Sequence, residues 1–393
     1  MKRSNANIRL PANADVWVLA GQSNMEGCGY ISRIERDPNV YCFTTHHEWT
    51  IAKDPLHDLI GSTAPVDWQL RKSMTPPDIA SQGDTSIREY WKGRNKGIGA
   101  GLGIAFGGLY ARETGRPVGL IAAAHGGTSL AQWSHTKKSE GLNSLYGAML
   151  ERIKLASGSL TGILWYQGES DASPESSAVY RDRFIDWVQA VRADTGKPNL
   201  PVVTVQLGCV ADAGRNPYGW EKIRDIQYAM PEHLSVIAVT SAIDLHLNDT
   251  IHIDAPGLTR LGKRMARCAL KLTGERKDIP LGPKFSGMSP RINDRGLGET
   301  DITFSGVTGE LLPQNAVHGF SVHTPDGTAH PRTRVCVAYR QENKRNIITV
   351  RTSVPLAAGD VISYGRGLLP VCDLTDAADM PVCAFSAAIE QRG

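Results

Sequence analysis

The chain has 393 residues, of which 41% are hydrophobic and 21% are charged, as is typical of globular proteins. This composition excludes an intrinsically disordered chain, and the length predicts roughly two to three domains with a substantial buried core. The 43 basic and 40 acidic residues give a formal net charge of +3, so we expect neither nucleic acid nor a membrane surface as a partner.

The sequence shows neither a membrane span, nor a signal peptide, nor a cysteine pattern typical of disulfides. No apolar run approaches the roughly 18 residues that a membrane span needs. Lys2 and Arg3 are not followed by an apolar segment, so we expect no signal peptide. This leaves a cytoplasmic protein, or an exported one whose signal has been removed. The seven cysteines are an odd number without a C-x-x-C pair, which predicts neither a disulfide framework nor a zinc-thiolate site. Nothing in the sequence indicates the oligomeric state.

Short apolar segments alternate with amphipathic segments from Asp15 to Thr273. The apolar segments are continuous, as in strands that are covered on both faces of a sheet. Strands are predicted at Asp15–Ala20, Val118–Ala124, Gly162–Tyr166, Val202–Leu207 and Val236–Thr240. Helices are predicted at Gly103–Glu113, Leu145–Ala156, Ala178–Asp194, Trp220–Met230 and Leu258–Leu272. This repetition predicts an α/β fold with a doubly wound parallel sheet.

The pattern of predicted secondary structure changes after Asp278–Pro290, a segment rich in proline and glycine that we interpret as a linker. Beyond it, short β-rich segments are separated by turn residues, and no helical pattern of useful length is present. Strands are predicted at Asp301–Phe304, Gly319–His323, Arg334–Tyr339, Ile347–Arg351 and Asp360–Tyr364. We therefore divide the chain into an α/β domain, residues 1–278, and a small all-β domain, residues 279–393.

Ligands of open parallel sheets bind at the carboxyl ends of the strands, so the residues that follow each predicted strand are candidates for chemistry. The first strand is followed by Gly21-Gln22-Ser23-Asn24-Met25. A serine on such a strand-to-helix turn projects its hydroxyl from the sheet, near N–H groups that favour an oxyanion. Ser23 is therefore a candidate nucleophile, and N-capping of the following helix is the alternative.

The second predicted strand is followed by His125-Gly126-Gly127-Thr128. Paired glycines let the backbone approach a ligand closely and can offer N–H donors. Taken alone, these residues are explained equally well by a plain turn.

The third predicted strand is followed by Trp165-Tyr166-Gln167-Gly168-Glu169-Ser170-Asp171. The Gln167 amide could donate to a developing oxyanion without adding charge. The same stretch half matches a G-x-S-x-G nucleophile elbow, and Glu169 with Asp171 could form the carboxylate pair of a glycosidase. Solvated polar loop residues are the remaining alternative.

The last predicted strand is followed by a loop in which Asp249 and His252 have D-x-x-H spacing. This spacing lets the carboxylate accept the Nδ1–H of the imidazole and leaves Nε2 available as a base. His246 and His252 could instead ligate zinc together with the neighbouring aspartates. In a third interpretation, Asp244 ends the strand and Asp254 caps the next helix.

Together these motifs place a nucleophile, N–H and amide donors and an Asp–His base at successive strand ends, as one active site requires. The chain resembles SGNH-type hydrolases, specifically the carbohydrate acetylesterases that include sialate O-acetylesterases and acetylxylan esterases. The resemblance covers Val16 to Leu272, and the segment Tyr364–Phe385 is similar to the tail of sialate O-acetylesterase-like members. The matching blocks are Gly21-Gln22-Ser23-Asn24-Met25, Trp49–His57, Gly97–Phe106, Gly126–Trp133, Trp165–Asp171 and Asp249-Thr250-Ile251-His252.

This resemblance implies a three-layer α/β/α, flavodoxin-like hydrolase domain that needs no metal and no organic cofactor. Ser23 would be the nucleophile, His252 the general base and Asp249 the partner that orients His252. The expected function is a serine esterase that removes O-acetyl groups from an acetylated carbohydrate through an acetyl-enzyme intermediate.

The oxyanion hole implied by the resemblance consists of the Ser23 and Gly127 backbone N–H groups and the Gln167 side chain. Gly126 is the alternative to Gly127, and many SGNH enzymes have asparagine where this chain has Gln167. Residues expected to contact the substrate or support the site are Asn24, Gly126, Glu169 and Trp133.

Other functions stay open at this point. An acetylxylan or pectin-type acetylesterase is the alternative within the group. A metal-dependent deacetylase would be inhibited by a chelator, and a glycosidase would release reducing ends instead of acetate. A sugar-binding module without activity is disfavoured, because every member of the expected triad is present.

Overall fold

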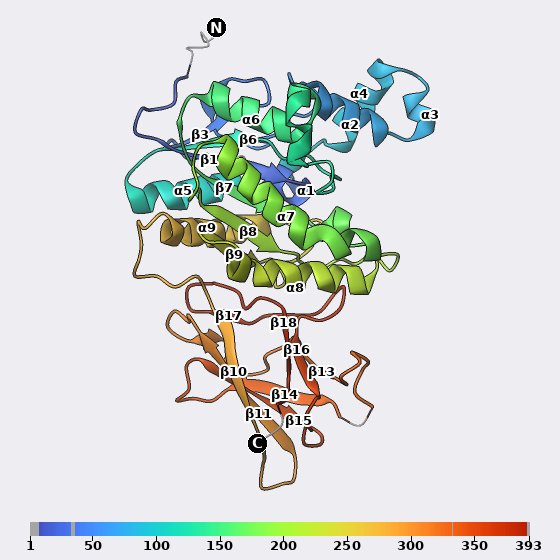
Figure 1. Cartoon of the computed structure of the whole chain (residues 1–393), viewed down its shortest axis with the longest axis vertical. Helices are drawn as coiled ribbons and strands as arrows, with labels where there is room; N and C mark the ends of the chain where they lie inside the picture. The colour runs from blue at the N-terminus through green and yellow to red at the C-terminus, as the bar shows by residue number, and fades with distance from the viewer. Residues whose placement is uncertain (1–7, 33–35, 332, 391–393) are drawn as a thin grey trace.

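The computed structural model describes residues 8–32, 36–331 and 333–390. Figure 1 shows an α/β region, from the N-terminal part of the chain, stacked on a β-rich region from the C-terminal part. The architecture changes between α9 (Ala255–Leu272) and β10 (Lys284–Ile292). The expected domain boundary at residue 278 lies in this interval and stays a prediction.

The α/β region is organised around a seven-stranded sheet with the order β4-β3-β6-β1-β7-β8-β9. Its strand pairs are parallel except for β3 with β4. The strands are β1 (Asp15–Gly21), β3 (Val40–Phe43), β4 (Trp49–Ile51), β6 (Val118–Ala122), β7 (Ser159–Tyr166), β8 (Val202–Gln206) and β9 (Ile237–Ser241). The strands predicted for this region are thus confirmed as β1, β6, β7, β8 and β9. Strands β6 and β8 are buried along their whole length, which explains their continuous apolar sequence.

The helices cover both faces of this sheet. The chain reaches β6 on one side of β1 through α5, whereas α6, α7 and α8 lead to β7, β8 and β9 on the other side. On one face of the sheet α5 packs against α9, and on the other face α7 packs against α8. The bounds are α5 (Gly103–Thr114), α6 (Leu145–Ala156), α7 (Pro174–Asp194) and α8 (Pro217–His233). The predicted α/β/α architecture is confirmed.

Where element ends differ from the prediction, local chemistry explains the difference. Helix α7 begins at Pro174, earlier than expected, because Ser173 accepts the Ser176 N–H and proline suits a first turn. Strand β9 begins after Val236, which has a φ of 52° and so cannot continue a strand. Within the described ranges, no helix has the length and apolar character that a membrane crossing requires.

The segment between β4 and α5 was not predicted to contain helices. It forms the helical insertion α2 (Pro65–Ser73), α3 (Pro77–Ala80) and α4 (Asp84–Arg94), followed by β5 (Ile98–Ala100), which pairs with β2 (Gly29–Tyr30). Helix α4 buries only Ile87 and Trp91, so it lacks a clear apolar stripe in the sequence. In Figure 1 the insertion projects at the upper right, on the side of the sheet where α1 (Ser23–Glu26) lies. Two 3-10 segments, η1 (His135–Asn143) and η2 (Glu169–Asp171), complete this region.

The C-terminal region consists of antiparallel sheets with the orders β10-β11-β15-β14, β13-β16-β18 and β12-β17. The strands predicted here correspond to β11, β13, β14, β15 and β16. The linker interpretation of Asp278–Pro290 is wrong from Lys284 onward, where β10 begins. Strand β10 lies at the edge of its sheet, where a proline removes no needed hydrogen bond. The other bounds are β11 (Gly298–Ser305), β12 (Leu311–Leu312), β13 (Phe320–His323), β14 (Val335–Arg340), β15 (Ile347–Thr352), β16 (Val361–Tyr364), β17 (Thr375–Asp376) and β18 (Phe385–Ala388).

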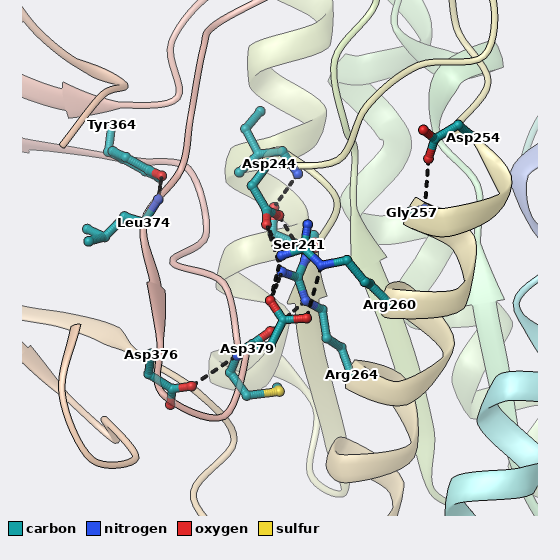
Figure 2. Close-up of polar contacts among 12 residues, drawn as sticks. Ser241, Asp244, Asp254, Gly257, Arg260, Arg264, Tyr364, Leu374, Asp376 and Asp379 are labelled. Carbon is teal, nitrogen blue, oxygen red and sulfur yellow. Dashed lines mark hydrogen bonds and ion pairs between the residues drawn. The ribbon is translucent and has the colours of Figure 1, made fainter. Parts of the chain in front are cut away.

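The two regions share a buried interface. Ile243, just after β9, belongs to one hydrophobic cluster with core residues of the C-terminal region such as Ile362. Beside it, Arg264 of α9 bonds Asp244 at 2.8 Å and Asp379 of the C-terminal region at 2.9 Å. Figure 2 shows the guanidinium groups of Arg260 and Arg264 between these two carboxylates. The C-terminal region is therefore anchored at the start of the loop that follows β9.

Candidate active site

Ser23 lies directly beyond β1 and is the first residue of α1. The chain turns at Gly21, which has a φ of 132°, and a Cβ atom there would lie 2.1 Å from the Tyr166 carbonyl oxygen of β7. Only glycine fits this position. Gln22, and not Ser23, occupies the N-cap of α1. The N-capping alternative for Ser23 is therefore wrong, and its hydroxyl contacts another residue.

That residue is His252, which lies 229 positions away in the sequence. The Ser23 Oγ lies 2.9 Å from His252 Nε2, and His252 Nδ1 lies 2.7 Å from Asp249 Oδ2. Because an ionised carboxylate can only accept, Nδ1 carries the proton and Nε2 accepts the Ser23 hydroxyl. This is the order of contacts that a general base needs in order to activate a serine.

The carboxylate of Asp249 also organises its own loop. Its Oδ1 accepts the backbone N–H groups of Ile251 and His252, each at 2.8 Å. Burial by itself would raise the pKa of Asp249, but the hydrogen bonds from the His252 side chain and these two N–H groups outweigh it and hold the pKa below its usual range. Asp249 is therefore ionised wherever the imidazole is required to act as a base.

Asn24 and Glu169 support this loop from beneath. Asn24 Oδ1 accepts the Ile253 N–H at 3.0 Å, and its Nδ2 donates to Glu169 Oε1 at 2.9 Å. Glu169 is 2% exposed, and its Oε2 has no hydrogen-bond partner among the described residues. Burial raises the pKa of Glu169, although the Asn24 hydrogen bond opposes the shift. The expected supporting roles of Asn24 and Glu169 fit this chain of contacts from η2 to the His252 loop.

The paired glycines lie against Ser23. A Cβ atom on Gly126 would lie 3.3 Å from the Ser23 Cβ, and both glycines line the same pocket as Ser23. The Gly126 N–H donates to Glu26 Oε2 at 2.7 Å. The N–H groups of Ser23 and Gly127, in contrast, have no acceptor in the part of the chain that the structure describes. Of the two glycines, Gly127 is thus the one with an available donor.

Gln167 is not placed as expected for an oxyanion donor. Its side chain is completely buried, and its Nε2 donates to Asp171 Oδ2 at 2.5 Å and to the Thr128 carbonyl oxygen at 3.1 Å. Both amide hydrogens are therefore used in joining the strand ends of β6 and β7. The same oxygen, Asp171 Oδ2, also accepts the Leu130 N–H at 2.8 Å, so one carboxylate holds both the Leu130 backbone and the Gln167 amide.

Trp133 and Asp171 are parts of the packing and not of the pocket. Trp133 is fully buried, donates from Nε1 to Thr128 Oγ1 at 3.0 Å, and packs edge-on against Trp165. The expected contact of Trp133 with substrate is therefore not supported. Because Asp171 holds Leu130 and Gln167, it does not face the cavity opposite Glu169, and the glycosidase pair does not form.

The cavity beside Ser23 has a volume of about 480 Å³ and extends to the helical insertion. One wall is formed by the triad loop and η2, and the other by α2, α4 and the segment that follows α4. Sequence analysis missed the α2 and α4 part of this wall because no motif marks these helices, whereas Ile98 and Gly99 belong to the matching block Gly97–Phe106. The basic side chains of this wall are Arg71, Lys92 and Arg94, and Arg215 lines the same cavity from the loop after β8.

The side chains that could have ligated zinc are not grouped around a common point. Across residues 8–32, 36–331 and 333–390, no three His, Cys, Asp or Glu side chains are grouped so that they could hold a metal ion. Asp244 contacts Arg264 and Arg260 and neither histidine of its loop. His252 is engaged by Ser23 and Asp249 through its two ring nitrogens.

A serine, an imidazole and a carboxylate in contact at the carboxyl ends of a parallel α/β/α sheet are the arrangement of a serine hydrolase. Residues 13–271 match the family model described as carbohydrate esterase, sialic acid-specific acetylesterase, and the chain belongs to this family. The resemblance to carbohydrate acetylesterases inferred from the motifs is thereby confirmed.

Individual relatives agree with this assignment. A probable carbohydrate esterase from Arabidopsis thaliana is 28% identical over 279 residues, which cover 66% of this chain and 92% of that protein. A crystal structure of a carbohydrate acetylesterase from Xanthomonas citri aligns with a TM-score of 0.66 at 20% identity, over 95% of this chain and 80% of that one. A structure from Arabidopsis thaliana aligns with a TM-score of 0.51 at 23% identity, over 66% of this chain and 99% of that one. The two structural alignments establish a shared fold.

Proposed function

We propose that this chain is a serine-dependent carbohydrate O-acetylesterase in which Ser23, His252 and Asp249 carry out the chemistry. The observation that carries the proposal is the continuous set of contacts, 2.9 Å from Ser23 to His252 and 2.7 Å from His252 to Asp249, at the wall of an open pocket. Ser23 reaches the pocket from the strand end at which ligands of doubly wound sheets bind.

In the first half of the reaction, Ser23 Oγ forms a bond with the acetyl carbonyl carbon while His252 Nε2 takes the hydroxyl proton. The bond between that carbon and the sugar oxygen then breaks, and the sugar alcohol leaves with the proton from His252. In the second half, water adds to the acetyl-enzyme and gives its proton to His252. The bond between the acetyl carbon and Ser23 Oγ then breaks, Oγ takes the proton back from His252, and acetic acid leaves and ionises to acetate.

The negative charge that develops on the carbonyl oxygen needs nearby donors. The backbone N–H groups of Ser23 and Gly127 are suited to this task, because both belong to residues that line the pocket and neither has an acceptor among the described residues. Asp249 stabilises the imidazolium that forms on His252, and the buried carboxyl of Glu169 adds to that stabilisation when it is ionised.

For the substrate, we propose an acetylated acidic sugar of the sialate type, in keeping with the family description. Lys92 and Arg94 of the insertion line the pocket and have no acidic partner within the described part of the chain. Arg215 faces them, paired with Asp212 at 3.3 Å on an exposed loop. Acetylated pectin fragments are acidic as well, whereas acetylated xylan backbones are neutral, so the cations of Lys92 and Arg94 favour the first two substrates over the third.

The test is acetate release from acetylated sialic acid, acetylated pectin fragments and acetylated xylan, measured for wild type and for Ser23→Ala. We expect the wild type to prefer the acidic substrates and Ser23→Ala to lose roughly 10⁴-fold or more of the activity while remaining folded by circular dichroism. Full activity in Ser23→Ala would refute the serine mechanism. A preference for xylan would refute the proposed substrate and leave the mechanism standing.

A further inference from the structure

Glu26 ends helix α1 and carries a carboxylate that reaches across to the paired glycines. Its Oε2 accepts the Gly126 N–H at 2.7 Å, and its Oε1 contacts Arg71 Nη2 at 2.5 Å. The side chain of Glu26 is 12% exposed and that of Arg71 is 8% exposed. This is an ion pair largely removed from solvent, next to the nucleophile on the same short helix.

The contact with Gly126 determines which glycine N–H faces the reaction. The Gly126–Gly127 turn packs so closely on Ser23 that a Cβ on Gly126 would lie 3.0 Å from Glu26 Oε2 and 3.3 Å from Ser23 Cβ. With the Gly126 N–H used by Glu26, the Gly127 N–H is left as the donor from this turn. Gly127 has a φ of 70°, a conformation that glycine adopts without strain and that other residues rarely adopt.

The backbone of Glu26 is tied to the same segment. Its carbonyl oxygen lies 2.9 Å from His57 Nδ1, and His57 Nε2 accepts the Ala124 N–H at 3.2 Å. Because Nε2 is an acceptor, Nδ1 carries the proton and donates to Glu26. Burial lowers the pKa of His57 to about 4, so this neutral form persists over the pH range in which an esterase of this type works.

Arg71 connects Glu26 to the helical insertion. Its guanidinium group lies over the Trp91 ring at 4.4 Å, and the Trp91 Nε1 donates to the Arg71 carbonyl oxygen at 3.2 Å. Helices α2 and α4 thus hold Arg71, Arg71 holds Glu26, and Glu26 holds Gly126. The insertion that forms the far wall of the pocket is connected through these three contacts to the donor beside Ser23.

We propose that Glu26 is a positioning residue that orients the Gly126–Gly127 turn for oxyanion stabilisation, and that Arg71 fixes Glu26 in this role. The proposal rests on the function proposed above, since it requires that Ser23 attacks a carbonyl. A carboxylate is needed because it accepts from Gly126 and Arg71 at once, through two oxygens. A glutamine has one acceptor oxygen, and its NH₂ group would face either the Gly126 N–H or the Arg71 guanidinium.

The test compares Glu26→Gln with wild type and with Glu89→Gln, a matched control on the exposed side of α4. Rates are measured with 4-nitrophenyl acetate and normalised to active sites by the 4-nitrophenol burst. For Glu26→Gln we expect kcat to fall about 10- to 100-fold with KM changed less than about threefold. The pH dependence of kcat/KM should keep its wild-type shape. Glu89→Gln should match wild type.

Two further measurements distinguish positioning from a merely structural role. The affinity for a trifluoromethyl ketone that mimics the tetrahedral adduct should fall in Glu26→Gln by the same factor as kcat/KM. Arg71→Met should lower kcat in the same direction. A kcat per active site within twofold of wild type in Glu26→Gln, or a loss confined to KM, would overturn the proposal. Activity in Ser23→Ala would instead overturn the proposed function itself.

Discussion

Two histidine–aspartate pairs with nearly identical local geometry occur in the two regions of this protein. In the α/β region, Asp249 accepts the His252 backbone N–H at 2.8 Å and contacts Nδ1 at 2.7 Å. In the C-terminal region, Asp373 accepts the His318 backbone N–H at 2.9 Å and contacts Nδ1 at 2.7 Å. Each carboxylate therefore fixes the same tautomer and leaves Nε2 as the reactive nitrogen.

The surroundings of the two imidazoles differ. His252 Nε2 contacts Ser23 Oγ, and the His252 side chain is 22% exposed within the pocket. The His318 side chain is 58% exposed, and no contact of its Nε2 is found among the described residues. An imidazole oriented by a carboxylate thus occurs in both regions of the protein. It becomes a general base only where the tertiary fold places a nucleophile and donors beside it.

The two pairs should differ most in how strongly kcat falls when the carboxylate is replaced by an amide. Asp249→Asn should lower kcat by about 10²- to 10⁴-fold, since the amide no longer fixes the tautomer or stabilises the imidazolium. Asp373→Asn should leave kcat within twofold. Steady-state rates with an acetylated sugar check both variants. Equal losses in the two variants would contradict the distinction drawn here.

A smaller effect on activity is expected from a change in the buried hydrogen bonds of Gln167 in the α/β region. Gln167→Leu leaves the Asp171 carboxylate and the Thr128 carbonyl without their donor, which should cost about 1–3 kcal/mol of the free energy of unfolding. Turnover per folded molecule should fall less than about tenfold. Urea unfolding and normalised rates check these values. A loss of 10²–10³ in turnover with unchanged stability would identify Gln167 as an oxyanion donor after all.

The smallest effect should be a pH dependence from Glu169, which supports the His252 loop through Asn24. Because burial raises the pKa of Glu169, the folded chain binds this proton more tightly than the unfolded chain. Stability from this group is therefore present below the unfolded pKa, about 4.3, and is lost as the pH rises through the raised folded value. Between the unfolded and the folded pKa, the free energy of unfolding of Glu169→Gln should therefore rise relative to that of wild type. Above the folded pKa, the difference between the two proteins should be constant. Urea unfolding of both proteins from pH 4 to 8 measures the trend. A difference that is the same at every pH would contradict it.

The sequence predicted an element correctly where its residue pattern is typical of one kind of secondary structure. Short continuous apolar runs between amphipathic segments are typical of covered parallel strands, and β1, β6, β7, β8 and β9 follow them closely. The insertion α2–α4 escaped notice because its helices bury few apolar residues and are held by contacts such as Arg71 with Trp91, which lie 20 positions apart. Strand β10 was hidden by prolines and glycines that an edge strand tolerates.

By itself, the sequence determined the alternation of strands and helices, the sharp turn at Gly21 and the short-range bond between Asp249 and His252. These features depend on neighbours within a few positions, so local chemistry is sufficient to predict them. Only the tertiary structure decided that Gln167 turns inward to Asp171, that Gly126 is occupied by Glu26, and that His252 meets Ser23 while His318 meets no nucleophile. Such choices depend on which groups compete for each donor across distant segments, and that competition exists only once the chain is packed.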